Sequence, residues 1–119
     1  MRVPRPYRLN FVFRQDGDFQ FVYRLKNPDG SLVNVSGWTV EMQVRATLAG
    51  NVLATLSTGS GHITLGGSNG TITIAYPKAT IAGLGWTAAL FDIRETPPAG
   101  RATYRFTGGI SVVKQVTRG

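Results

Sequence analysis

Apolar and polar residues alternate with a period of two over three separate stretches of this chain. The alternating apolar positions are Phe19, Phe21, Tyr23 and Leu25, then Val40, Met42 and Val44, then Ile72, Ile74 and Tyr76. Successive side chains of a β-strand point to opposite faces, so this pattern predicts strands with one buried face. We expect the core to include Phe21, Tyr23, Val40, Met42, Val44, Ile72, Ile74, Phe106 and Val112.

Turn signals separate the expected strands. Asp16-Gly17 and Asn69-Gly70 each lie between apolar runs, a pattern typical of tight hairpins. Asn27-Pro28-Asp29-Gly30 has Pro second and Gly fourth, which predicts a type I turn. Pro77 ends a strand, and residues 79–85 predict a connector, because Gly83 and Gly85 disfavour a long helix.

The last third of the chain predicts strands over residues 86–94, 101–107 and 110–116, with a bulge or bend at Gly108-Gly109. The whole chain then holds about eight to nine short strands, which favours an all-β sandwich or a small barrel.

The length of 119 residues fits a single domain. We expect an extended arm over residues 1–6, because Pro4 and Pro6 disfavour helix there, followed by one domain over residues 7–118. The start of the chain has no apolar segment typical of a secretory signal, and no run approaches the ~18 apolar residues of a membrane span. There is no cysteine, which excludes disulfides and thiolate metal sites.

The net charge of +7 is unevenly distributed along the chain. Eight of the 13 basic residues lie in the two terminal segments: Arg2, Arg5, Arg8 and Arg14 at the start, and Arg101, Arg105, Lys114 and Arg118 at the end. Because domain termini are often close together, we expect all of these except Arg14 to contact an acidic partner surface. The alternatives are contact with nucleic acid and ordinary solvated arginines on strand faces.

No residue pattern predicts catalysis, a metal site or a cofactor. His62 is the only histidine and lies in an expected loop. Asp16, Asp18 and Asp29 occur where turn chemistry already explains them. Residues 66–70 are glycine-rich but lack the Lys and the helix start of a phosphate-binding loop, so they predict a hairpin.

Aromatic and basic residues are adjacent at Tyr7-Arg8, Tyr23-Arg24 and Tyr104-Arg105. Such pairs serve as stacking platforms in proteins that bind single-stranded nucleic acid. On a strand, however, neighbours point to opposite faces, so we expect the aromatics to point inward and the arginines outward.

Three segments in order carry a resemblance to a known family. Residues 29–38 (DGSLVNVSGW) are similar to a "dG-x-pvdLtGat" element, Phe91-Asp92-Ile93 to a "Y-x-fDi" strand, and residues 109–118 (GISVVKQVTR) to a closing strand that ends in VTR. The chain thus resembles small tail and baseplate structural proteins of tailed bacteriophages, and the N-terminal immunoglobulin-like domain of phage baseplate upper proteins. Asn34 replaces the usual acid, and Trp86-Thr87 replaces a typical Gly-Tyr pair.

The resemblance implies an immunoglobulin-like antiparallel β-sandwich with a structural role in the virion and no catalytic residues. We expect a non-enzymatic adaptor in the tail or baseplate, assembled from the host cytoplasm as a homo-oligomeric ring that docks fibres or neighbouring tail proteins. A small basic nucleic-acid-binding β-barrel and a capsid decoration protein are the alternatives.

Overall fold

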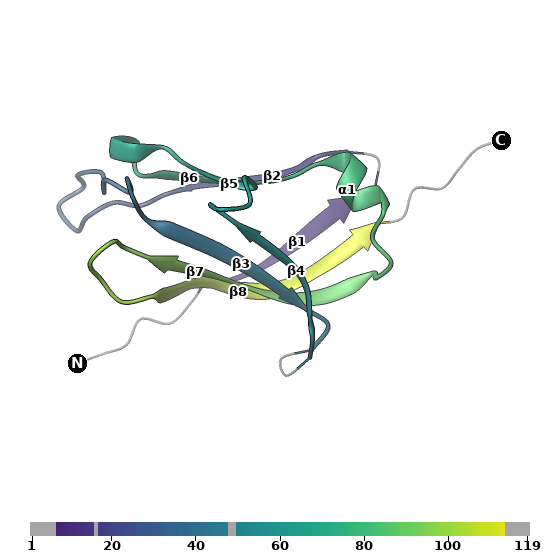
Figure 1. Cartoon of the computed structure of the whole chain (residues 1–119). Helices are drawn as coiled ribbons and strands as arrows, with labels where there is room; N and C mark the ends of the chain where they lie inside the picture. The colour runs from purple at the N-terminus through teal and green to yellow at the C-terminus, as the bar shows by residue number, and fades with distance from the viewer. Residues whose placement is uncertain (1–6, 16, 48–49, 114–119) are drawn as a thin grey trace.

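The computed structural model describes residues 7–15, 17–47 and 50–113, which form two packed β-sheets (Figure 1). The expected arm over residues 1–6 lies outside this range. The described elements are β1 (Tyr7–Arg14), β2 (Phe19–Arg24), β3 (Thr39–Arg45), β4 (Val52–Ser57), β5 (Ile63–Leu65), a 3-10 turn (Gly67–Asn69), β6 (Thr71–Tyr76), α1 (Lys78–Ala82), β7 (Ala88–Thr96) and β8 (Thr103–Val113).

The strand order is that of an immunoglobulin-like sandwich. One sheet has the order β1-β8-β7-β3-β4 and the other has the order β2-β6-β5. If β1 to β8 are taken as strands A, B, C, C′, D, E, F and G, the sheets read B-E-D and A-G-F-C-C′, and the extension of the G-F-C sheet by C′ is that of a variable-type domain. The predicted sandwich is therefore confirmed. Every described strand pair is antiparallel except β1 with β8, which is parallel.

The core lies between the two sheets and follows the period-two pattern. Val40, Met42 and Val44 of β3 face Ile72 and Ile74 of β6 across the sandwich, and all five side chains are fully buried. Val112 is also buried, and the three predicted aromatic core residues, Phe21, Tyr23 and Phe106, are partly buried against the same cluster. The predicted core is thus confirmed.

The hairpin predicted at Asp16-Gly17 is wrong, because β1 and β2 belong to different sheets. The chain crosses between the sheets here, and this crossing lets aromatic side chains of both strands pack against each other with tilted rings. The Phe11 and Phe21 ring centroids are 5.0 Å apart, and those of Phe13 and Phe19 are 4.6 Å apart. The aromatic packing outweighs the local turn preference, and Asp16 itself lies outside the described residues.

The other turn predictions agree with the structure. Gly30 donates its backbone N–H to the Asn27 carbonyl at 2.9 Å, as in a type I turn. The turn at Asn69-Gly70 joins β5 to β6, with Gly70 in the left-handed conformation at a φ of 71°. β6 ends at Tyr76 before Pro77, and most of α1 lies in the connector expected over residues 79–85. None of the described helices is long and apolar enough to cross a membrane.

The last two predicted strands are one continuous strand, β8, and the bulge predicted at Gly108-Gly109 lies elsewhere. The register shifts opposite Ile93 and Arg94, which leaves Arg105 as the extra residue. Gly108 instead allows β1 to approach, because a Cβ at this position would collide with the Leu9 carbonyl. The glycine therefore marks close backbone contact between two strands.

Candidate interaction surface

The structure describes three of the seven basic residues predicted to bind a partner. Arg8 on β1 and Arg101 before β8 are exposed, whereas Arg105 is half-buried. Arg2, Arg5, Lys114 and Arg118 lie outside the described residues. A patch formed by all seven is therefore still a prediction.

Arg105 is held by a buried polar cluster between the sheets. Its Nε and Nη2 atoms donate to Glu95 Oε1 at 3.1 and 3.0 Å, and the Tyr23 hydroxyl from the other sheet donates to Glu95 Oε2 at 2.8 Å. Glu95 is completely buried. Burial and the adjacent Glu95 charge raise the pKa of Tyr23 far above its ordinary value, and the Arg105 charge only partly offsets this effect.

The expected orientation of Tyr104 and Arg105 is wrong. The extra residue in β8 places Tyr104 outward, with 49% of its surface exposed, and directs the Arg105 guanidinium to Glu95. A buried carboxylate requires a paired cation, and Arg105 is the cation within reach. The sequence contains a signal for this cluster. Phe91, Ile93 and Glu95 are two residues apart, so Glu95 points to the same buried face of β7 as the two apolar residues.

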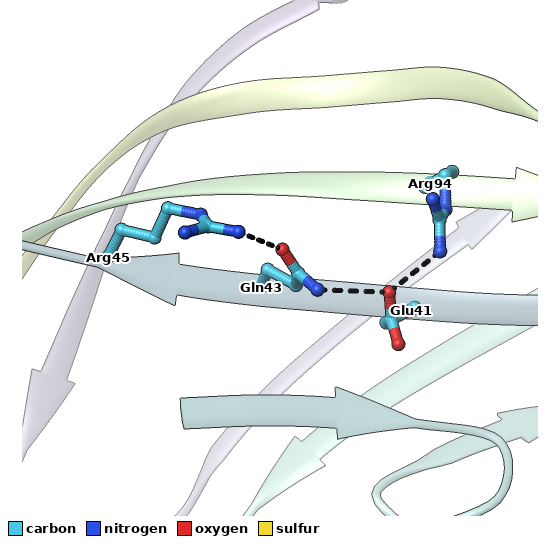
Figure 2. Close-up of polar contacts among 4 residues, drawn as sticks. All are labelled: Glu41, Gln43, Arg45 and Arg94. Carbon is cyan, nitrogen blue, oxygen red and sulfur yellow. Dashed lines mark hydrogen bonds and ion pairs between the residues drawn. The ribbon is translucent and has the colours of Figure 1, made fainter. Parts of the chain in front are cut away.

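A polar network crosses the outer face of the five-stranded sheet (Figure 2). Arg94 pairs with Glu41 at 2.9 Å, Gln43 Nε2 donates to Glu41 Oε1 at 3.4 Å, and Arg45 Nη2 donates to Gln43 Oε1 at 2.8 Å. A second Arg45 nitrogen donates to the Gly50 carbonyl at 2.8 Å. Sequence reasoning recognised the alternation of β3 but assigned no role to its polar side.

The pairing register of the strands shows which residues lie side by side on this outer sheet face. One level across the strands, from β1 to β4, contains Arg8, Thr107, Asp92, Gln43 and Thr55. The next level contains Asn10, Gly109, Leu90, Arg45 and Val52. We use the name outer sheet face for these two levels together with Glu41, Arg94, Val12 and Val113.

Large apolar side chains are exposed on the outer sheet face. Val12 is 52% exposed, Val52 43%, Val113 41% and Leu90 36%. No described element packs over them, because the second sheet covers only the opposite side (Figure 1). The face therefore combines a network of charged groups with exposed apolar positions.

Asp92 lies in a small depression on this face. The depression has a volume of about 50 Å³ and is lined by Gln43, Arg45, Thr47, Leu90, Phe91, Asp92 and Thr107. Partial burial raises the pKa of the Asp92 carboxyl, and the charges of Arg45 and Arg94 oppose this shift. The depression admits a water molecule or the tip of a side chain.

The remaining polar side chain considered from the sequence is His62, in the loop between β4 and β5. The half-buried His62 lies 2.8 Å from the Ser60 hydroxyl through Nδ1, and its ring packs 5.5 Å from that of Tyr76. Residues 7–15, 17–47 and 50–113 contain no group of three His, Cys, Asp or Glu residues placed to hold a metal ion.

No protein-family model matches this chain, and no curated protein matches it either. Among solved structures, the chain is similar to "Drosophila OTK, extracellular domains 3-5", with 13% sequence identity, a TM-score of 0.39 and a match over 98% of this chain. The match spans only 36% of that structure. A likeness this weak carries no argument about function, and the immunoglobulin-like fold is established by the strand order described above.

Proposed function

We propose that this protein is a non-enzymatic structural adaptor of a tailed-phage virion, placed in the tail or baseplate. It docks neighbouring virion proteins or fibres through the outer sheet face and the basic terminal segments. The outer sheet face is the observation that carries the proposal, and the resemblance of three ordered sequence segments to phage tail and baseplate proteins supplies the setting.

The apolar positions of the outer sheet face support docking. The three exposed valines and Leu90 share one sheet face and can be buried by a flat partner surface, which gives a favourable free energy of about 25 cal/mol per Å² of apolar area. Single exposed apolar residues are common on protein surfaces, and what supports docking here is that four of them share a sheet face that no described element covers. The surrounding ion pair of Arg94 and Glu41 would set the orientation of the partner rather than its affinity.

The proposal is tested by co-expressing the chain with the products of its neighbouring genes and measuring co-purification. Leu90→Lys places a charge at the centre of the outer sheet face and should weaken capture of the partner. Thr64→Lys is the matched control, because Thr64 is exposed on β5 of the other sheet. Equal capture by both variants, with unchanged melting temperatures, would contradict a docking role for this face.

A second candidate function is binding of nucleic acid. Tyr104 is exposed and pairs in register with Arg94, which places an aromatic ring beside a cation on the protein surface. Retention on DNA that falls steeply with salt would favour this function over the adaptor, because phosphate contacts release counterions. Retention that does not depend on salt would leave the adaptor as the better explanation.

A further inference from the structure

Strand β2 has an open edge. Among the described residues, β2 is paired only with β6 in its sheet. The Leu25 N–H bonds to the Gly70 carbonyl at 2.9 Å, so by alternation Phe19, Phe21 and Tyr23 direct their backbone groups toward β6. The backbone N–H and C=O groups of Gln20, Val22 and Arg24 consequently face away from the sheet.

The other edges of the described sheets are less available. β5 has three residues. At the end of β4, the Ser60 hydroxyl accepts a hydrogen bond from the Ser57 N–H at 3.0 Å and so occupies an edge group. Along β1, the carbonyl of Arg14 already accepts a hydrogen bond from the Gly17 N–H at 3.3 Å.

The sequence of residues 1–6 has a pattern suited to an open strand edge. Pro4 and Pro6 have the same parity, while Met1, Val3 and Arg5 occupy the alternate positions. Proline has no backbone N–H, and within sheets it is tolerated at an edge where that group would face solvent. In an added strand, the odd residues can therefore bond to β2 while the two prolines leave no unused N–H on the far side.

We infer that residues 1–6 of a second copy of this chain add to β2 as an antiparallel strand, with Val3 opposite Val22 and Arg5 opposite Gln20. This register pairs three odd residues of the arm with three open positions of β2. It also covers Val22, whose side chain is 53% exposed. Pro4 and Pro6 then lie on the new sheet edge, where their missing N–H groups prevent another strand from pairing.

The charges and the surface at the start of β2 support this register. A shallow depression of about 330 Å³ is lined by Asp18, Phe19, Gln20, Ala75, Tyr76 and Pro77. Opposite Gln20, the side chain of Arg5 would lie over this depression, near the exposed Asp18.

The arm that adds to β2 is more readily supplied by a second copy of the chain than by the same copy. Tyr7 pairs with Phe106, whose ring is 4.9 Å from that of Tyr23 near the end of β2. An arm folding back from Tyr7 onto its own β2 would run parallel to it and would place Arg5 near Arg24. An antiparallel arm must enter from the opposite end of β2, and a neighbouring copy can supply it there.

The arm leaves the sandwich at the Tyr7 end of β1, and a neighbour's arm would enter at the Phe19 end of β2. These two strand ends lie at opposite ends of the sandwich (Figure 1). Each contact therefore leaves a free arm at one end and an open β2 edge at the other, and repetition gives a ring or an open chain. The inference shares with the proposed function only the idea that the arm makes an intermolecular contact. Its test uses the purified chain alone, so a failure of self-association can be distinguished from a failure to dock other virion proteins.

The test measures self-association by sedimentation together with hydrogen exchange of the β2 amides. The wild-type chain should associate and protect the amides of Gln20, Val22 and Arg24, whereas deletion of residues 1–6 should leave a folded monomer in which these amides exchange. The swap V3P/P4V keeps composition and charge but moves a proline to a bonding position. We expect it to weaken association by about tenfold or more.

Pro4→Val is the matched control and should associate like the wild type, because residue 4 faces away from β2. Asp18→Asn retains an acceptor for the Lys78 N–H but removes the charge, and it should weaken association in a salt-dependent manner. A wild-type chain that stays monomeric, or a swap variant that associates as well as Pro4→Val, would overturn the inference. Protection of the β2 amides in a monomer would also overturn it, since that result assigns the arm to its own copy.

Discussion

At the scale of single residues, Glu95 joins the two sheets at one end of the sandwich. It accepts hydrogen bonds from Tyr23 in one sheet and from Arg105 in its own sheet, and solvent does not reach it. Removal of either donor leaves a buried carboxylate with fewer partners, which is more costly than the loss of an exposed ion pair. The extra residue in β8 is what places Arg105 within reach.

Tyr23→Phe should destabilise the domain by about 1–3 kcal/mol at neutral pH, because Glu95 Oε2 loses its donor. Urea unfolding measures this change. Phe106→Leu is a useful comparison, since it changes the same partly buried cluster without removing a hydrogen bond.

The stability of the wild type should fall as the pH rises above about 10, the ordinary pKa of tyrosine. Burial and Glu95 raise the pKa of Tyr23 in the folded state, so above that pH the unfolded chain loses a proton that the folded chain retains. Tyr23→Phe should make the free energy of unfolding less dependent on pH between about 9 and 11. An unchanged slope in that variant would show that Tyr23 does not contribute.

Val44→Ala should lower the free energy of unfolding by about 1–3 kcal/mol through lost burial and the cavity that remains. Val44 is fully buried on β3, between the neighbouring strands β4 and β7. The same substitution at Val12, which is 52% exposed, should cost much less. Equal losses at the two positions in urea unfolding would be incompatible with the described register.

At the scale of elements, the turn before β6 depends on one glycine. Gly70 has a φ of 71°, and a Cβ there would lie 2.7 Å from the Leu25 carbonyl oxygen and 2.9 Å from that of Val33. Gly70→Ala should therefore destabilise the domain by about 1–3 kcal/mol. Gly85→Ala is the control, because no atom lies within 4 Å of its Cβ position, and thermal unfolding of the two variants should differ clearly.

Local sequence patterns predicted the strands better than their partners. The alternation in β3 and β6 identifies which side chains are buried, because that information is contained within each strand. The position of β1 beside β8 is not local, since it depends on packing between Phe11 and Phe91, whose rings are 4.6 Å apart and stacked. Asp16-Gly17 therefore predicted a hairpin where the chain crosses between sheets.

The candidate surface was the part that sequence reasoning predicted least. Polar residues at Glu41, Gln43 and Arg45 indicate only that one side of β3 faces solvent. Their connection to Arg94 and the depression at Asp92 depend on which strands are neighbours. The basic residues near both ends of the chain predicted a partner-binding patch, but Arg105 forms an ion pair with the buried Glu95.

At the scale of the whole molecule, the described sandwich is elongated, with extents of 55 × 29 × 23 Å. The outer sheet face occupies one side, and the open edge of β2 belongs to the opposite sheet. The two proposed contacts thus use different surfaces, and one copy can dock a virion protein while it receives the arm of a neighbour.

The parallel pairing of β1 with β8 determines how the molecule responds to tension. Because the two strands run the same way, the Tyr7 end of β1 and the Val113 end of β8 lie at opposite ends of the sandwich (Figure 1). Pulling on both ends slides the strands past each other, and their hydrogen bonds must break together rather than one after another. A domain of this kind, linked in series with others, would carry mechanical load along its length through the contact between β1 and β8.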